Sequence, residues 1–449
     1  MIATLSSPRF GLELRATFRL AAPLALAQLA QMGMGLTDTV MLGSLGRDAL
    51  AAGGLGAAMF FTLVVVLQGL VNSVGILVAH AQGANDVEKI PALLRGGFVL
   101  AAIAAAPLML LLWNAEPLLL LIGEPPRLAH DVMGYVRILL FATPASMWLG
   151  VQRSYLSAVG KTRLVMIVAV AALFANGLMN YGLIHGKFGL PEMGYLGSAT
   201  ASLIAIWGMM AATTAGMRRV QVAREPSPIQ WHIVRELLAL GWPIAVTVGV
   251  EIVLFLVGAL MMGVLGATSV AAHQVTINVA SMTFMVALAM GQAANVRVGF
   301  YMGAGDPRAA RRAASAALLL GVGFMAVAAA VMLIAPYQIA LLFNLDPRTD
   351  AEVIALVVRL LAICAFFQVF DGAQTIAAGA LRGLKDTRVP ALLAGLSYWA
   401  VGFPIAWALG FPMGWGPTGV WWGLAISLAV TAVVLNVRFW RLSAKLARA

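Results

Sequence analysis

Charged residues are scarce in this 449-residue chain. Asp, Glu, Lys and Arg together make up 10% of it, whereas hydrophobic residues make up 61%. A soluble domain is about one-quarter charged. The composition therefore excludes a soluble protein and indicates an integral membrane protein with short connecting loops.

Several groups that would carry chemistry are also missing. The single cysteine, Cys364, lies in an apolar segment, so no disulfide can form within the chain. No Gly-x-x-x-x-Gly-Lys-Ser/Thr loop for nucleotide phosphates occurs, and neither does a cluster of metal-ligating residues. These absences argue against an enzyme, a bound cofactor and ATP-driven transport. Any work done by this chain should draw on an ion gradient.

Long apolar runs fill most of the sequence. A membrane-spanning helix needs about 20 apolar residues. We therefore expect an all-α integral membrane protein with twelve transmembrane helices. The expected spans lie near residues 16–40, 49–80, 92–114, 131–155, 163–186, 195–217, 235–262, 270–300, 313–336, 353–380, 389–410 and 417–439.

The positive charges lie mainly on one side of this arrangement. Of 29 Lys and Arg residues, 23 belong to the N-terminus, every second loop or the C-terminal tail, and Arg153, Arg297 and Arg382 are counted among them. The positive-inside rule then places both termini in the cytoplasm. The net charge of +11 reflects topology and contact with lipid, and not nucleic acid. Short loops and the lack of a targeting segment indicate a bacterial inner membrane.

The two halves of the chain resemble each other at a spacing of 220 residues. The matching motifs include Leu20-x-x-Pro23 with Leu240-x-x-Pro243, and Leu45-Gly46 with Leu265-Gly266. Because each half holds six spans, both enter the membrane in the same direction and form two parallel six-helix lobes. We expect an N-lobe at 1–217, a cytoplasmic linker at 218–235 and a C-lobe at 236–449. In such transporters the substrate site lies between the halves.

Three of the eighteen acidic residues lie inside long apolar runs: Asp38, Glu251 and Asp371. An intramembrane carboxylate costs about 2.5–3.5 kcal/mol on insertion scales, and it usually faces a cavity that handles an ion, a proton or a cationic substrate. The internal repeat does not extend to these acids. They therefore favour transport as the function and are the first candidates for its site.

Asp38 shares one helix face with Gln31 and is predicted to face a cavity or a partner helix. Alternatively, it lies near the outer membrane surface as a solvated helix cap before Gly43. Asn176 and Asn180, one turn apart on a later span, could line a cavity beside Asp38. They could equally serve to hold helices together.

Glu251 lies near the middle of its span, one turn after Thr247. Burial disfavours the charged form of a carboxylate, so Glu251 could bind and release a proton or hold a monovalent cation. Asp371 shares a face with Gln368 and Thr375. The alternative for both acids is a cluster of hydrogen bonds that serves only helix packing.

Four segments carry a resemblance to a known family: Thr37–Gly43, Asn176–Gly197, Ala271–Gln274 and Leu381–Pro390. They resemble the multidrug and toxic compound extrusion (MATE) family, and the resemblance covers nearly the whole chain. Glu251 paired with Asp371 resembles its NorM branch. The resemblance implies export of small cationic amphipathic compounds in exchange for inward Na⁺ or H⁺. It implies that Glu251 and Asp371 hold the coupling cation, Na⁺ included.

The resemblance also suggests roles outside the paired acids. Asp38, Asn176 and Asn180 match the family's proton or substrate site. Some relatives place a Tyr near the bound cation where this chain has Phe284, which offers a ring face instead of an oxygen.

Gln274 and Asn278 share one face at the start of the eighth span. They are further candidates for the cavity lining.

Two other transport functions fit parts of the sequence. A flippase for lipid-linked saccharides would need a cavity rich in Arg and Lys, whereas the charges within the spans are acidic. A major-facilitator transporter also has two parallel halves, but residues 81–91 do not match the Gly-x-x-x-Asp-Arg/Lys-x-Gly loop that follows its second span. We expect a monomeric secondary antiporter.

Overall fold

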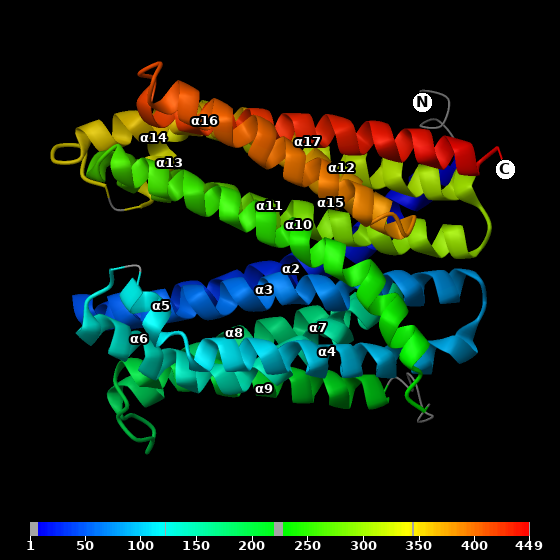
Figure 1. Ribbon diagram of the computed structural model, residues 1–449, viewed down its shortest axis with the longest axis horizontal. Helices are drawn as coiled ribbons and strands as arrows, with labels where there is room; N and C mark the ends of the chain where they lie inside the picture. The colour runs from blue at the N-terminus through cyan, green and yellow to red at the C-terminus, as the bar shows by residue number, and fades with distance from the viewer. Residues whose placement is uncertain (1–7, 122, 220–227, 344, 449) are drawn as a thin grey trace. The chain divides into compact units, whose positions relative to one another are not determined.

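The computed structural model describes residues 8–121, 123–219, 228–343 and 345–448. Twelve helical segments within these residues are long and apolar enough to cross a membrane. Their order along the chain can be followed in Figure 1. The prediction of an all-α membrane fold with twelve spans is confirmed.

The chain divides into two compact units. The N-terminal unit contains Leu26–Ala81 and Asp86–Ala245, and the C-terminal unit contains Met1–Ala25, Gln82–Asn85 and Val246–Ala449. The predicted division at 1–217, 218–235 and 236–449 stays a prediction. Residues 220–227 of the predicted linker lie outside the described residues.

Two helices change from one unit to the other near the middle of their length. Helix α2 (Pro8–Ser44) does so after Ala25, and α10 (Trp231–Val264) does so after Ala245. Each change follows an internal proline, Pro23 or Pro243. A proline inside a helix removes one backbone hydrogen bond and favours a kink. Helix α10 begins at Trp231, so its first residues fall within the range predicted as linker.

The N-terminal unit is a helical bundle. Within it α8 packs on α9, α4 packs on α7, and α9 also contacts α6 and α7. Besides its parts of α2 and α10, its elements are α3 (Arg47–Gly83, of which the last two residues belong to the C-terminal unit), η1 (Val87–Lys89), α4 (Ile90–Trp113), α5 (Glu116–Leu121), α6 (Pro126–Leu139), η2 (Leu140–Ala142), α7 (Thr143–Ala158), α8 (Thr162–His185) and α9 (Tyr195–Arg219).

The C-terminal unit is arranged around α14, which packs against α11, α12 and α17. Trp421 is fully buried in this unit's apolar core. Besides its parts of α2 and α10, the unit contains α11 (Ala267–Gly303), α12 (Pro307–Ile334), α13 (Pro336–Leu341), α14 (Ala351–Gly383), α15 (Arg388–Leu396), the π-helical segment η3 (Ser397–Gly402), α16 (Phe403–Gly410) and α17 (Gly416–Leu446).

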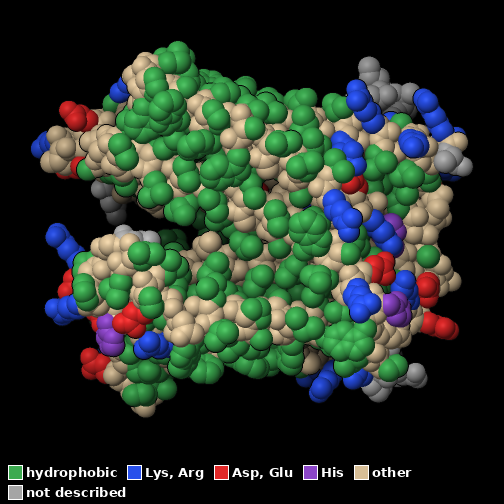
Figure 2. All heavy atoms as spheres, in the orientation of Figure 1, with side chains coloured by type: hydrophobic (Ala, Val, Ile, Leu, Met, Phe, Trp, Pro, Cys, Tyr) green, Lys and Arg blue, Asp and Glu red, His purple; other side chains and the backbone are tan. Residues whose placement is uncertain are grey.

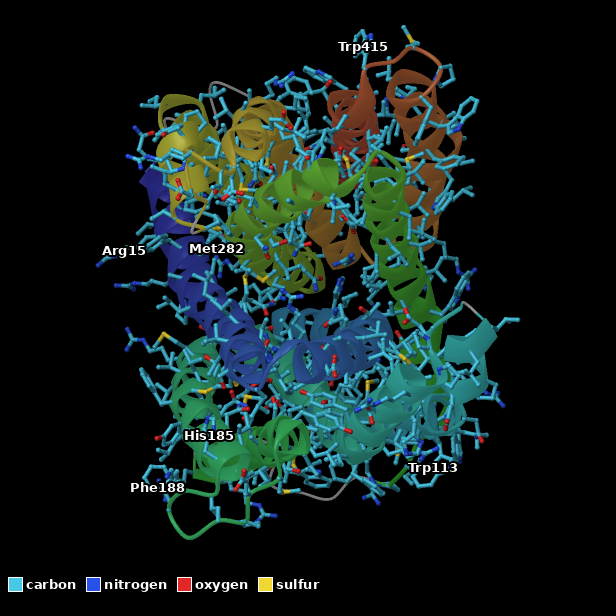
Figure 3. The ribbon with its side chains drawn as sticks, turned by 90° about the vertical axis from the view of Figure 1, so that its left-hand side faces the viewer. Arg15, Trp113, His185, Phe188, Met282 and Trp415 are labelled. Carbon is cyan, nitrogen blue, oxygen red and sulfur yellow. The ribbon has the colours of Figure 1, made fainter. Side chains whose placement is uncertain are left out.

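The internal repeat is visible in the turns that end equivalent helices. The turn after α2 contains Gly46 with φ of 108°, and the turn after α10 contains Gly266 with φ of 107°. Side chains rarely adopt this conformation, so both turns need glycine. Helix α8 ends in a similar way at Gly186, with φ of 64°. Beyond that cap lies Phe188, which is labelled with His185 in Figure 3.

Close backbone contact joins α11 to α14. A Cβ atom added to Gly379 would collide with the backbone of Gly291. Small residues allow helices to approach closely in a membrane, where apolar side chains gain little by leaving the lipid. This contact fixes the position of α14 along the axis of α11. It therefore helps to place Asp371 and Gln374, which lie eight and five residues before Gly379 on the same helix.

The outer surface is apolar along the helices. Exposed side chains include Leu36, Phe174 and Leu260. Figure 2 shows hydrophobic side chains over the visible sides of each unit, with Lys and Arg gathered toward the helix ends. The apolar sides of the helices are suited to contact with lipid, and their charged ends are suited to contact with water and headgroups.

Candidate functional site

Asp38 is the centre of a buried polar cluster in the N-terminal unit. Its Oδ1 accepts a hydrogen bond from Asn180 Nδ2 at 2.7 Å, and its Oδ2 accepts one from Ser202 Oγ at 2.7 Å. Asp38 is 4% exposed and lies inside α2, which continues to Ser44. The alternative of a solvated helix cap is therefore wrong. The carboxylate joins α2 to α8 and α9.

The two asparagines of this cluster keep free acceptors. Asn176 Nδ2 donates to Ser202 Oγ at 3.4 Å, and Asn180 Nδ2 also donates to the backbone oxygen of Asn176 at 3.0 Å. The Oδ1 atoms of both residues are buried and have no hydrogen-bond partner among the described residues. The cluster thus places amide oxygens near a carboxylate, which suits a proton or a cation.

Glu251 and Asp371 share one hydrogen-bond donor in the C-terminal unit. Gln374 Nε2 donates to Glu251 Oε1 at 3.0 Å and to Asp371 Oδ1 at 3.1 Å. Tyr398 Oη donates to Gln374 Oε1 at 2.7 Å, which fixes the orientation of the amide. The structure therefore brings the two predicted acids together on facing helices, α10 and α14.

The arrangement of these two acids can bind a cation. When both carboxylates are charged they repel each other, and the shared amide offers only partial positive charge. A proton or a monovalent metal ion would relieve that repulsion. Arg382, on the same helix as Asp371, attracts Glu251 through its charge. The acid pair is thus neither isolated nor fully neutralised by an ion pair.

Sequence reasoning missed three members of these clusters. Gln374 lies three residues after Asp371, so helical spacing could have identified it. Ser202 and Tyr398 come from helices far along the chain, α9 and η3, and no spacing in the sequence connects them to the acids.

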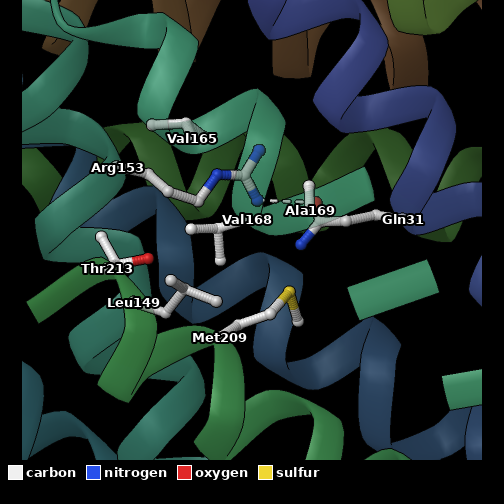
Figure 4. Close-up of a pocket in the computed structure, with 8 residues that line it drawn as sticks. All are labelled: Gln31, Leu149, Arg153, Val165, Val168, Ala169, Met209 and Thr213. Carbon is white, nitrogen blue, oxygen red and sulfur yellow. Dashed lines mark hydrogen bonds between the residues drawn. The ribbon is translucent and has the colours of Figure 1, made fainter. Parts of the chain in front are cut away.

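Gln31 is part of a different group from Asp38. Its Oε1 accepts a hydrogen bond from Arg153 Nη1 at 2.6 Å, as Figure 4 shows. The two residues line a small cavity between α2, α7, α8 and α9. Arg153 was expected among the cytoplasmic basic residues. It lies in the last turns of the span that ends with α7 at Ala158, near the end of the predicted span 131–155.

Gln368 and Thr375, predicted on the Asp371 face, lie against α11. Gln368 Nε2 donates to Thr283 Oγ1 and to the backbone oxygen of Ala280. Thr375 packs near Gly291. Both residues therefore connect helices in this structure.

The remaining predicted lining residues are Thr247, Gln274, Asn278 and Phe284. Thr247 lies one turn before Glu251 on α10 and is half-buried. Gln274 is exposed, and Asn278 Nδ2 donates to its backbone oxygen at 2.8 Å. Phe284 is half-buried on α11. These four residues stay candidates for the lining.

The chain has relatives among known families, proteins and structures. The family model described as MatE matches residues 23–182 and 243–408. A protein of Burkholderia mallei named probable multidrug resistance protein NorM is 49% identical over 439 residues, which covers 96% of this chain and 93% of that protein. The multidrug resistance protein NorM of Burkholderia vietnamiensis is 49% identical over 432 residues, which covers 94% of this chain and 93% of that protein.

A solved structure, the eukaryotic MATE transporter AtDTX14, has the same fold. It matches with a TM-score of 0.87 at 22% identity, and the match covers 98% of this chain and 99% of that chain.

Proposed function

Because the chain belongs to the MatE family of transporters, we propose that it is a secondary active antiporter that exports small cationic amphipathic compounds in exchange for inward Na⁺ or H⁺. The relatives named multidrug resistance proteins support multidrug efflux rather than enzymatic activity. Twelve spans among the described residues make the chain a multi-pass membrane protein. It acts as a monomer in the bacterial inner membrane, with both termini in the cytoplasm.

The single observation that carries this proposal is the shared amide between Glu251 and Asp371. Gln374 holds both carboxylates at hydrogen-bonding distance without neutralising either of them. Intramembrane acids of this kind mark ion and proton pathways. We assign the coupling cation, Na⁺ or H⁺, to this pair. Asp38 with Asn176 and Asn180 supplies a second site, for a proton or for the substrate's positive charge.

Exchange follows from competition between the coupling cation and the substrate. One carboxylate cannot fully satisfy two cations, so binding of one weakens binding of the other. Each ligand shifts the population of transporter states only by its differential affinity for them. The inward ion gradient then drives export of the substrate. No nucleotide is required.

Of the two rival functions, the major-facilitator alternative is removed by membership of the MatE family. Flipping of lipid-linked saccharides remains the second candidate. The acidic clusters around Asp38 and Asp371 argue against it, because a diphosphate needs a mainly basic cavity.

Ethidium efflux from bacteria that lack their own pumps tests this function. Cells expressing the protein are loaded with ethidium and energised with Na⁺, without Na⁺, and with a protonophore added. Efflux that needs Na⁺ and resists the protonophore identifies a Na⁺ antiporter. Efflux that collapses with the protonophore in the absence of Na⁺ identifies a H⁺ antiporter.

Two matched variants connect efflux to the acid pair. Glu251→Gln should reduce efflux at least tenfold, because the cation site loses a carboxylate. Glu352→Gln, an exposed acid in the first turn of α14, is the control and should export at the wild-type rate. Equal efflux by both variants, with unchanged ion dependence, would refute the assignment. The absence of efflux from the wild type under every condition would favour the flippase alternative.

A further inference from the structure

A group of basic side chains surrounds the contact between the start of α12 and the end of α17 in the C-terminal unit (Figure 1). The guanidinium of Arg311 lies over the ring of Trp440, 5.3 Å from the ring centroid. Arg308 lies one turn before Arg311 on α12, and Arg441 follows Trp440 on α17; Arg308 and Arg441 are exposed. We call these four residues the α12–α17 patch. Neither helix contains an acidic residue.

The acidic residues at this end of the C-terminal unit already have basic partners. The pairs are Glu13 with Arg297 at 2.7 Å, Asp306 with Arg312 at 3.9 Å and Asp386 with Arg438 at 2.6 Å. No carboxylate of a described residue lies within salt-bridge distance of Arg308, Arg311 or Arg441. The positive charge of the α12–α17 patch is therefore left for an anion from outside the protein.

The side chains provide this anion site, and the start of the helix does not. Pro307 has no N–H group, and the side chain of Asp306 accepts a hydrogen bond from the backbone nitrogen of Ala309 at 2.8 Å. The first turn of α12 is thus already capped by a carboxylate. An anion would meet the guanidinium groups of the α12–α17 patch.

The surroundings of the patch place it at the boundary between lipid tails and headgroups. On α17, Val437 and Val433 lie three and seven residues before Trp440. On α12, Leu319 lies eight residues after Arg311, and all three apolar side chains are exposed. Tryptophan is enriched at the level of the headgroups, where its ring meets both lipid and water. A lipid at the patch would have its phosphate at the arginines and its acyl chains along the exposed apolar side chains.

The chemistry of the patch matches a phosphate group. Arg binds phosphate oxygens through two parallel hydrogen bonds and stays charged. The ring of Trp440 attracts the guanidinium of Arg311 and restricts its orientation. Phosphatidylcholine carries an ammonium group that would be repelled by three guanidinium groups. Phosphatidylglycerol has no such group, so the patch should prefer it.

We propose that the α12–α17 patch binds the phosphate of an anionic phospholipid in the leaflet on the side of the C-terminus. Basic surfaces between membrane helices recognise such headgroups. The site is separate from the clusters around Asp38, Glu251 and Asp371, and it does not depend on the proposed transport function.

Native mass spectrometry of the purified full-length protein tests this site. The protein is mixed with phosphatidylglycerol and phosphatidylcholine of matched acyl chains, and the collision energy is raised until the phosphatidylcholine is lost. The wild type should still hold one phosphatidylglycerol. Arg311→Gln/Arg441→Gln should lower the fraction of protein that retains this lipid by about tenfold or more, because two charges near the headgroup are lost. Trp440→Leu, which keeps every charge, should give a smaller loss because Arg311 is no longer held by the ring.

The matched control is Arg218→Gln/Arg219→Gln. It removes the same number of charges from the exposed end of α9 in the N-terminal unit and should retain the lipid like the wild type. Equal loss in the two double variants would overturn the proposal, because general attraction between basic residues and anionic lipid would then explain binding. Wild-type retention by Arg311→Gln/Arg441→Gln would also overturn it, as would retention of both lipids alike by the wild type. Displacement of the lipid by inorganic phosphate alone would show a phosphate site that needs no lipid, and would refute the assignment.

Discussion

At the scale of single residues, an amide side chain accompanies each charged group of the candidate sites. Asn180 bonds Asp38, Gln374 bonds both Glu251 and Asp371, and Gln31 bonds Arg153. An amide carries both donors and acceptors, so it can hold a charged group in place without forming an ion pair. The charged group keeps enough free capacity to bind an ion or a substrate.

We expect Gln374→Leu to destabilise the protein. The substitution removes the one donor that Glu251 and Asp371 share and leaves two carboxylates facing each other. The free energy of unfolding should fall by about 1–3 kcal/mol, the usual cost of leaving a buried polar group without its partner. Thermal denaturation of the purified protein in detergent measures this loss.

Two further variants define what the Gln374→Leu result means. Tyr398→Phe removes the hydroxyl that donates to Gln374 Oε1 and keeps the amide of Gln374, so it should cost about 1 kcal/mol. Gln338→Leu, on the exposed side of α13, should have little effect. If Gln374→Leu were as stable as Gln338→Leu, the shared amide would contribute nothing.

At the scale of helices, backbone contact positions the acid pair. Asp371 and Gln374 lie on α14, which meets α11 at Gly379 and Gly291. The contact leaves no space for a methyl group. Helix α10, which carries Glu251, is held to α14 through the Gln374 amide. The site therefore depends on how closely α11 and α14 approach.

Gly379→Ala should weaken this helix contact. The added methyl group would meet the backbone of Gly291, and overpacking of this kind costs about 1–3 kcal/mol. Ethidium efflux should fall together with the denaturation temperature.

Gly395→Ala is the matched control for Gly379→Ala. A Cβ atom there meets nothing within 4 Å, and alanine favours the helix by up to about 1 kcal/mol. If Gly379→Ala were as stable and active as Gly395→Ala, close packing would not control the site.

The sequence predicts the spans and the intramembrane acids well, for a physical reason. A span must be apolar over about 20 residues and a buried carboxylate is costly, so both features stand out without knowledge of the fold. Partners on other helices do not stand out in this way. Ser202 and Tyr398 are ordinary residues until the bundle places them beside Asp38 and Gln374.

Arg153 shows a second limit of prediction from sequence. The positive-inside rule counts basic residues near the ends of spans without regard to where the side chain points. The structure directs Arg153 toward Gln31 within the N-terminal unit. Glu13 is a second charged residue of this kind. It lies near the start of the first span, yet it is buried against Arg297 and Tyr301.

At the scale of the whole molecule, the two halves of the chain share a helical repeat but carry their buried acids at different positions. Equivalent turns at Gly46 and Gly266 have nearly the same backbone conformation. Asp38, however, corresponds to Gly258, and Glu251 corresponds to Gln31. Each unit thus has its own polar cluster on a similar helical frame.

The orientation of the chain can be tested with single cysteines. Cys364 is fully buried, so a membrane-impermeant maleimide should leave the wild type unlabelled. With both termini in the cytoplasm, Asp48→Cys should react in intact cells, and Glu88→Cys should react only after the membrane is permeabilised. The reverse pattern would invert the proposed topology.

The most direct test of the central claim is ion movement driven by a substrate gradient in proteoliposomes. An ethidium gradient is imposed, and counterflow is followed with ²²Na⁺ and with a pH-sensitive dye. We predict that wild-type protein and Glu352→Gln move one of these ions against the ethidium flux, whereas Glu251→Gln and Asp371→Asn do not. Wild-type counterflow in either of the last two variants would contradict the assignment of the coupling cation to Glu251 and Asp371.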